Sequence, residues 1–410
     1  MADVLMARKV VIVGGGQAGY QVAASLRGKK FDGSIAILGE EPALPYQRPP
    51  LSKGYVKGEA KESTLLLRAA DFYTTNAIEM RTDCHVTALD RAAREVVLAT
   101  GERVAYDSLV LATGGRVRKL PVPGAELAGV AYVRTLADAK SLKPQIEAAT
   151  NVVVVGGGFI GLECASVASV LGCKVVVLEA MDRLMARVVS PVLSDYYRDL
   201  HRSRGVDVRL GESVTEIVGS DGRVTGVRCG DGSTVPADLV VVGIGIIAND
   251  DLAKAAGLAC DRGIVVDALL RTADPDIYAI GDCAAFPHPM AESLVRLESV
   301  QNAIDQGKAV ADAIMGDARP YAAVPWFWSD QYEVKLQIVG MTSQYDDTVT
   351  LGDVAAGRFS VLYFRNGGLI GIDSVNMPSD HVVGRKLFGA GKSVTAAAAR
   401  APGFSLRAQL

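Results

Sequence analysis

The sequence predicts an α/β protein in which two similar parallel-sheet units are followed by a smaller C-terminal part with an antiparallel sheet. Two β-branched runs, Val10–Val13 and Val152–Val155, each lead into a glycine-rich turn and then a helical pattern. From about Trp326 the pattern changes to alternating strands, which is typical of antiparallel sheets. At 410 residues the chain is long enough for two or three domains.

The first glycine-rich turn follows Val13 and has the spacing G-x-G-x-x-G between a strand and a helix. In this motif the first glycine makes a tight turn, the second lets the backbone approach a pyrophosphate, and the third lets the helix pack closely on the strand. The phosphate lies at the helix N-terminus, where free N–H groups favour an anion. The next strand ends in a carboxylate that can bind a ribose. A Rossmann-like dinucleotide site is therefore predicted at Gly14, Gly16, Gln17, Ala18, Gly19 and Glu40.

The second turn repeats the pattern, and the strand after it ends at Glu179. A carboxylate there favours NAD(H), because it repels the 2′-phosphate of NADP(H). Arg183 and Arg187 follow closely and could instead meet a phosphate. One such motif is weak evidence, but two motifs with acidic partners predict two dinucleotides bound at once. The expected residues of this site are Gly156, Gly158, Phe159, Ile160, Gly161, Glu179, Arg187 and Gly245.

The second unit interrupts the first. A strand ending at Thr113-Gly114 closes the first segment, and Pro121 and Pro123 mark a linker. The inserted unit ends in a strand that runs into Gly243 and Gly245, so the two endings correspond as in an internal duplication. The predicted domains are residues 1–116, 117–245, 246–325 and 326–410.

The rest of the chain supplies a strand ending at Gly281-Asp282, a helix and then three alternating strands. The helix is expected around Gln301 to Ile314, and the strands at Lys335–Val339, Phe359–Arg365 and Leu369–Val375. We interpret His381 as structural. The tail from Lys392 onward is expected to be loosely ordered.

Composition excludes several classes. A net charge of −3 gives no global attraction to nucleic acid or anionic membrane. No apolar run approaches the ~18 residues that span a bilayer, and we expect no signal peptide, because few residues precede the first predicted strand. We therefore expect a cytoplasmic protein. The six cysteines form no C-x-x-C pair and the four histidines form no metal motif, so no metal site is predicted.

A family resemblance enters at Pro45-Tyr46-Gln47-Arg48-Pro49-Pro50-Leu51-Ser52-Lys53. This segment resembles a signature of NADH-dependent ferredoxin reductases of the putidaredoxin reductase type, in the glutathione-reductase superfamily of FAD flavoproteins. The runs 157–163, 298–303 and 325–331 support the resemblance, which covers nearly the whole chain. The redox cysteines that disulfide reductases, peroxidases and oxidases of the superfamily carry after the first turn are missing here.

The resemblance implies FAD in the first site and NADH in the second, with the NAD-binding domain inserted into the FAD-binding domain. It places Lys53 and Glu163 as an ion pair beside the flavin N5 and the nicotinamide, and these are the expected catalytic residues. Asp282 is expected to bind the ribityl chain. The remaining expected cofactor contacts are Arg48, Thr113, Gly114, the helix start at Val300, Glu298 near the carboxamide and Trp328 near the flavin ring.

The implied activity is of the EC 1.18.1 type. A hydride passes from NADH to the flavin, and electrons then leave singly to a [2Fe-2S] ferredoxin that feeds a cytochrome P450 or another oxygenase. Arg296, Lys308, Arg385 and Lys386 are candidate docking residues for that acidic partner, and a monomer or weak dimer is expected. Two alternatives stay open: a redox signalling flavoprotein like apoptosis-inducing factor, and an NADH oxidase.

Overall fold

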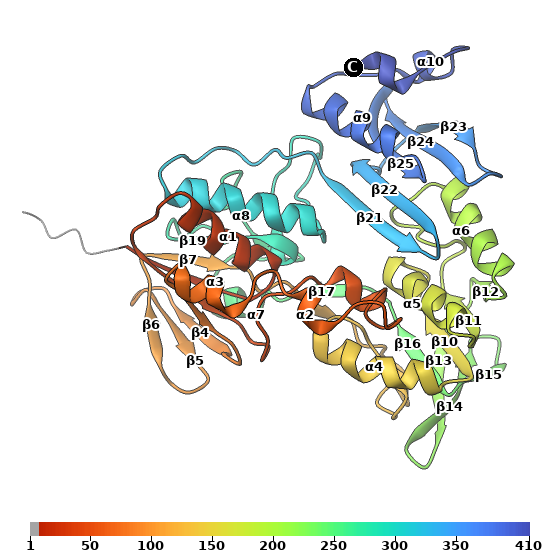
Figure 1. The fold of residues 1–410 in the computed structure, drawn as a ribbon, viewed down its shortest axis with the longest axis horizontal. Helices are drawn as coiled ribbons and strands as arrows, with labels where there is room; N and C mark the ends of the chain where they lie inside the picture. The colour runs from red at the N-terminus through yellow and green to blue at the C-terminus, as the bar shows by residue number, and fades with distance from the viewer. Residues whose placement is uncertain (1–7) are drawn as a thin grey trace, which may run out of the picture. The chain divides into compact units, whose positions relative to one another are not determined.

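The computed structural model describes residues 8–410, and the chain divides into two compact units (Figure 1). The first unit contains the residues up to Gln47 together with Leu65–Arg116 and Ile247–Pro325. The second contains Arg48–Thr64, Val117–Ile246 and Trp326–Leu410. The four-part division expected from the sequence stays a prediction, because each unit combines stretches from more than one of its parts.

The core of the first unit is a five-stranded parallel sheet with the order β19-β7-β1-β2-β3. Its aliphatic strands are buried almost throughout, as expected where helices cover a parallel sheet. Helices α1 and α8 pack on each other (Figure 1). The elements are β1 (Lys9–Val13), α1 (Gln17–Gly28), β2 (Ser34–Leu38), β3 (Ile78–Arg81), β7 (Ser108–Leu111), β19 (Ile277–Ala279) and α8 (Val300–Ile314).

A small antiparallel sheet, β4-β5-β6, belongs to the same unit. Its strands and the unit's short elements are β4 (Val86–Asp90), β5 (Glu95–Leu98), β6 (Arg103–Ala105), α3 (Ala70–Thr75), α7 (Asp251–Ala255), β18 (Ile264–Val265), η2 (Gly281–Cys283) and β20 (Ala284–Ala285). Three further elements lie where the chain changes unit: α2 (Glu62–Leu65), β8 (Gly115–Val117) and β17 (Ile246–Ala248).

The second unit repeats the parallel architecture, with strand order β12-β11-β10-β16-β9. Strand β16 pairs with β10 as β7 pairs with β1, so the two strand endings take corresponding places in the two sheets, as the sequence predicted. Strands β13, β14 and β15 form a separate antiparallel sheet. The elements are η1 (Pro49–Ser52), β9 (Val130–Ala131), α4 (Leu136–Ala148), β10 (Asn151–Val155), α5 (Phe159–Val170), β11 (Lys174–Glu179), α6 (Pro191–Ser203), β12 (Asp207–Leu210), β13 (Val214–Ser220), β14 (Arg223–Cys229), β15 (Thr234–Pro236) and β16 (Leu239–Val242).

The same unit also contains the predicted C-terminal antiparallel sheet, but with five strands in place of three. The expectation missed β21 (Trp326–Gln331) and β23 (Asp347–Asp353). Strand β23 is a mostly polar edge strand containing Gly352, so it carries little of the alternation that identifies a strand. The other elements are β22 (Val334–Gly340), β24 (Arg358–Arg365), β25 (Gly368–Val375) and α9 (Pro378–Gly389).

The expected loose tail is wrong. Residues after Lys392 form α10 (Ala396–Ala399) and η3 (Leu406–Gln409). Helix α10 contacts β23 and η3 contacts α9, and Val394 and Leu406 are buried. These apolar side chains order the segment although its composition, rich in alanine, gave no strong periodic pattern. His381 is buried and makes an edge-to-face ring contact with Trp326, as expected for a structural residue.

None of the helices within residues 8–410 combines the length and the apolar character needed to cross a bilayer.

The ordered tail predicts unequal effects for two leucine truncations. Leu406 is 4% exposed and Leu410 is 44% exposed. Leu406→Ala removes buried apolar surface and leaves a cavity, so it should lower the free energy of unfolding by about 2 kcal/mol or more. Leu410→Ala should change it by less than about 0.5 kcal/mol. Thermal and urea unfolding of both variants measure these free energies. Equal effects of the two substitutions would support a loosely ordered tail instead.

Candidate dinucleotide-binding sites

The first glycine turn allows an approach of backbone to backbone that a side chain would block. Gly14 has φ +122°, and a Cβ there would lie 2.1 Å from the carbonyl oxygen of Ala112. A Cβ at Gly19 would lie 2.1 Å from the oxygen of Gly14, so only glycine lets α1 start this close to β1. In contrast, a Cβ at Gly16 would meet nothing within 4 Å. The middle glycine therefore borders open space.

The N-terminus of α1 has no side-chain cap. Gly16 is its N-cap residue and makes no side-chain hydrogen bond. The first N–H groups of a helix have no partner within the helix and carry its positive partial charge. The open space at Gly16 and these N–H groups fit a dinucleotide pyrophosphate, as the sequence predicts for Gly14, Gly16, Gln17, Ala18 and Gly19.

Asp282 lies beside this turn, in η2. Gly281 has φ +74°, and a Cβ there would lie 3.2 Å from the Cβ of Ala18 on α1. The N–H of Gly281 donates to Oε1 of Gln306 on α8 over 2.7 Å. Gly281, the residue before Asp282, thus contacts Ala18 near the start of α1 and Gln306 on α8.

Helix α8 begins at Val300, as the expected flavin contact requires. Its N-cap residue is Ser299, whose Oγ accepts a hydrogen bond from the N–H of Asn302. That serine accepts one of the first-turn N–H groups of the helix. The N–H groups of Val300 and Gln301 lie at the positive end of the helix dipole.

Thr113 and Gly114 are fixed by Asn249, a residue that the sequence did not single out. The Thr113 hydroxyl donates to the Asn249 oxygen over 2.6 Å, and Asn249 Nδ2 donates to the Thr113 oxygen over 3.0 Å. The N–H of Asn249 also donates to the Gly114 oxygen. Asn249 directly follows β17, the strand by which the chain returns from the inserted unit. A polar amide side chain at the end of that strand is the sequence feature that could have indicated its role.

Two expected residues of the first unit pair with neighbouring side chains. Glu298 forms an ion pair with Arg296, with 2.7 Å between its Oε1 and the guanidinium nitrogen. The Arg296 guanidinium also donates a hydrogen bond to the Asp282 carbonyl over 3.1 Å. Arg296 therefore connects Glu298 with the Asp282 turn. Glu40 is exposed at the end of β2, 3.1 Å from His85.

The second glycine turn has the same geometry as the first. Gly156 has φ +105°, and its Cβ would lie 2.6 Å from the oxygen of Gly243. A Cβ at Gly161 would lie 2.1 Å from the oxygen of Gly156, whereas one at Gly158 would have its nearest neighbour at 3.9 Å. Gly158 caps α5 without a side-chain hydrogen bond. This turn fits a second pyrophosphate on the same grounds.

Glu179 lies at this turn. Its Oε2 accepts from the Gly157 N–H over 2.6 Å, and Oε1 accepts from the Met181 N–H over 2.7 Å. The guanidinium of Arg183 is occupied locally, by the carbonyls of Val189 and Ala186 and the Ser194 hydroxyl. Arg183 is therefore a structural residue.

Arg187 differs from Arg183, because its side chain is exposed. Its guanidinium lies 3.8 Å from the position of a Cβ on Gly245. The structure thus places Arg187 beside Gly245, and the sequence predicted both for the second site. Phe159 and Ile160 open α5, and Phe159 packs on Phe327 with 4.8 Å between ring centroids.

Lys53 and Glu163 meet in the second unit, as the resemblance implied. Lys53 Nζ lies 2.8 Å from Glu163 Oε2. The hydroxyls of Ser52 and Ser329 donate to Oε2 and Oε1 of the same carboxylate, each over 2.6 Å. The carboxylate therefore has a donor on each oxygen and a cation. The sequence did not predict these two serines, although a buried carboxylate demands donors.

Burial dominates the electrostatics of this group. Glu163 is 1% exposed, and the loss of water raises the pKa of its carboxyl group, while the Lys53 ammonium and the two hydroxyls lower it. A buried ion pair holds a geometry more than it adds stability, but removing one partner leaves the other uncompensated.

Two other expected residues of this unit, Trp328 and Arg48, have contacts of their own. Trp328 is half-buried on β21 and its ring lies 5.6 Å from that of Trp326. Arg48 precedes η1 and donates to the Arg134 carbonyl over 2.8 Å. Their expected flavin contacts stay predictions.

Two further features were missed by the sequence and do not belong to either glycine turn. Glu212, Cys229 and Asp231 bring one possible ligand atom each to within 4.8 Å of one another. Glu212 and Asp231 already accept backbone N–H groups, from Gly230 and Ser233. Burial raises the pKa of the Cys229 thiol, which disfavours the thiolate that binds a metal.

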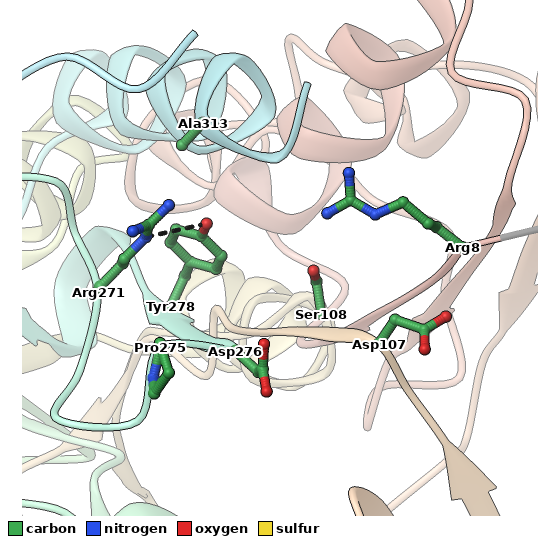
Figure 2. Close-up of a pocket in the computed structure, with 8 residues that line it drawn as sticks. All are labelled: Arg8, Asp107, Ser108, Arg271, Pro275, Asp276, Tyr278 and Ala313. Carbon is green, nitrogen blue, oxygen red and sulfur yellow. Dashed lines mark hydrogen bonds between the residues drawn. The ribbon is translucent and has the colours of Figure 1, made fainter. Parts of the chain in front are cut away.

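A cavity of about 480 Å³ opens at the other end of the first parallel sheet. Figure 2 shows Arg8 and Arg271 on either side of it in this view, with Ser108 between them. Its residues lie where β1, β7 and β19 begin, whereas the glycine turn follows the end of β1. Asp107 and Asp276 line it too, so its walls carry both signs of charge and favour no one ligand class.

Two parallel sheets, each with a glycine turn that admits a pyrophosphate, define a protein that binds two dinucleotides. The family model described as pyridine nucleotide-disulphide oxidoreductase matches residues 8–307, and the one described as reductase C-terminal matches residues 326–410. The chain belongs to the pyridine nucleotide-disulphide oxidoreductase family, whose cofactors are FAD and NAD(P)H.

Curated relatives match over most of their length. Rhodocoxin reductase of Rhodococcus erythropolis is 46% identical over 97% of this chain and 93% of its own. A ferredoxin–NAD(P)(+) reductase of Sphingomonas sp. is 48% identical over 92% of each chain. The solved ferredoxin reductase for the CYP199A2 system of Rhodopseudomonas palustris is 48% identical, with a TM-score of 0.95 over 98% of this chain and 99% of its own. The resemblance to ferredoxin reductases is confirmed.

A matched pair of glycine substitutions tests the first turn. Gly19→Ala places a Cβ against the Gly14 oxygen, so α1 must move and the purified protein should lose most of its bound FAD. Gly28→Ala adds a Cβ at the end of the same helix, where nothing lies within 4 Å. Flavin absorbance relative to protein measures both, and equal FAD content would contradict the proposed site.

Glu163→Ala should destabilise the protein by about 3–5 kcal/mol, because Lys53 and two serine hydroxyls lose their shared acceptor. Glu147→Ala, an exposed glutamate on α4, is the control and should cost less than about 0.5 kcal/mol. Denaturant unfolding monitored by circular dichroism compares the two. A small loss of unfolding free energy in Glu163→Ala would mean that water can accept the hydrogen bonds that Glu163 accepts in the wild-type protein.

Proposed function

We propose that this protein is an NADH-dependent ferredoxin reductase of the EC 1.18.1 type. The observation that carries the proposal is the Lys53–Glu163 ion pair, whose Glu163 lies on α5, the helix that the second dinucleotide turn opens. The likeness to named ferredoxin reductases over nearly the whole chain, including the C-terminal sheet, supports it. The expected partner is an iron–sulfur ferredoxin that feeds a cytochrome P450 or another oxygenase.

The bound cofactors supply hydride and electron transfer, and the chain supplies binding and orientation. At the second turn, the free N–H groups of α5 would hold the pyrophosphate of the nucleotide, and Glu179 would contact its ribose. Glu163, on the same helix, fixes the Lys53 ammonium through one carboxylate oxygen. Ser52 and Ser329 prevent that carboxylate from rotating, because they hold both of its oxygens. A fixed geometry is what favours transfer between two aligned groups.

The contacts of the four candidate docking residues show which of them are available to a partner protein. Arg296 is committed to Glu298 and the Asp282 carbonyl, so it is a poor docking candidate. Arg385 lies over the Trp326 ring at 4.9 Å and is exposed, and Lys386 beside it is also exposed. Lys308 is exposed near Asp305. Complementary charge at Arg385 and Lys386 would mainly raise the association rate with an acidic ferredoxin.

The proposal includes a cytoplasmic location and a monomer or weak dimer. Its electron donor, NADH, is an intracellular reductant, and the six cysteines are free thiols in the structure.

Stopped-flow absorbance tests the function. The protein is mixed with NADH, with and without a [2Fe-2S] ferredoxin, under nitrogen and in air. Rapid flavin bleaching followed by reoxidation only with ferredoxin supports the proposal. Rapid reoxidation by air alone would indicate an oxidase, and slow bleaching with a persistent long-wavelength band would indicate a signalling flavoprotein.

Glu179 predicts the nicotinamide preference. Glu179→Gln keeps hydrogen-bonding capacity but removes the charge that repels a 2′-phosphate, so the kcat/KM ratio of NADH to NADPH should fall about tenfold or more. Steady-state ferredoxin reduction with each nucleotide measures the ratio. Glu147→Gln is the control, because Glu147 is an exposed carboxylate on α4 of the same unit. An unchanged ratio would mean that another residue selects the nucleotide.

A further inference from the structure

The segment between β11 and α6, residues 180–190, lies against the second glycine turn. The N–H of Met185 donates to the Gly157 oxygen over 3.0 Å. Leu184 Cδ2 lies only 2.6 Å from the position of a Cβ on Gly157. Arg187, at Gly245, belongs to this segment. Residues 180–190 thus form one wall of the site at which the second dinucleotide is expected, and we call them the 180–190 loop.

The C-terminal sheet holds the far end of this loop. The Thr342 hydroxyl, just after β22, donates to the Val188 oxygen over 2.7 Å. The Tyr363 hydroxyl, on β24, accepts the Ser190 N–H over 2.8 Å. These two hydrogen bonds bracket Val189, so they fix the backbone immediately after Arg187.

The hydrogen bond between Tyr363 and Ser190 is buried, and a second hydrogen bond orients the Tyr363 hydroxyl. Tyr363 and Ser190 are both essentially buried, and the Tyr363 hydroxyl donates to Asp373 Oδ2. Because its proton is given to Asp373, its oxygen is left to accept the Ser190 N–H. Burial raises the pKa of Asp373 to about 8. A buried N–H that loses its acceptor is costly, so the loop has a strong preference for this position.

The rest of the loop transmits the constraint to the site. The Arg183 guanidinium donates to the Ala186 and Val189 carbonyls, which closes the loop on itself. Met185 has φ +49°, a conformation that a non-glycine residue adopts only when its surroundings hold it. A change at residues 188–190 therefore reaches Met185 and Gly157 through a short, stiff stretch of backbone.

We infer that Thr342 and Tyr363 are positioning residues for the nicotinamide dinucleotide, which act through the 180–190 loop. This inference rests on the proposed function, since it assigns the second turn to NADH. It gives the C-terminal sheet a role in nucleotide affinity in addition to the Ser329 contact with Glu163.

The test uses the full-length, FAD-loaded protein and two variants that each remove one hydroxyl. Thr342→Val keeps the shape of the side chain, and Tyr363→Phe removes the acceptor of Ser190. Both should raise the dissociation constant of NAD⁺, measured by calorimetry, and the KM for NADH by about three- to tenfold, the range for one lost hydrogen bond. The kcat and the KM for ferredoxin should stay within about twofold.

Ser360→Ala is the matched control. Ser360 lies on β24 and is buried, and its hydroxyl contacts Ser374 and Asp380 and not the loop. It should leave NAD⁺ affinity unchanged even if it lowers thermal stability. Hydrogen exchange of peptides covering residues 180–190 should rise in Thr342→Val and Tyr363→Phe and stay at the wild-type level in Ser360→Ala.

The outcomes separate the two claims. If wild-type protein binds NAD⁺ and both loop variants bind it equally well, or if Ser360→Ala weakens binding as much, the positioning role is overturned. If Tyr363→Phe does not fold, Thr342→Val decides alone. If the wild-type protein binds NAD⁺ but reduces no ferredoxin, the proposed function fails while the affinity and exchange measurements still test the loop.

Discussion

The constraint on which both dinucleotide turns depend is the absence of space for a Cβ atom where each Rossmann-like helix crosses the strand before it. At Gly19 and at Gly161 the added atom would lie 2.1 Å from a carbonyl oxygen of the preceding turn. Because no backbone movement of a few tenths of an ångström relieves such an overlap, helix and strand meet in one way only. The uncapped helix start and the open space at Gly16 and Gly158 lie directly beside these close approaches.

Short-range pattern was enough to predict this part of the molecule. The glycine spacing, the β-branched runs and the acids at Glu40 and Glu179 are all local features, and the structure places them at the carboxyl ends of parallel strands. The Lys53–Glu163 pair came only from family resemblance, because no pattern within a window connects residues so far apart. Ser52, Ser329 and Asn249 were missed for the same reason: each acts through a tertiary contact with a distant residue.

Composition misled where tertiary packing decides. The alanine-rich tail and the polar edge strand β23 carry weak periodicity, yet both are ordered by the surfaces they contact. Conversely, Arg183, Arg187 and Arg296 look alike in the sequence. Only the structure separates an arginine that closes a loop, an exposed arginine at Gly245 and an arginine that joins Glu298 to the Asp282 turn.

The carboxylate of Glu163 is assembled from three distant stretches of chain: Ser52 lies 111 residues before it and Ser329 lies 166 residues after it. During synthesis, the parallel sheet of the second unit can form before the ribosome has made β21. Until then, one oxygen of a carboxylate destined for burial lacks its donor, which favours a solvated, partly open state. The arrival of β21 therefore completes the set of donors around Glu163, so a chain that ends before β21 can form its glycine turns without a fixed reaction geometry.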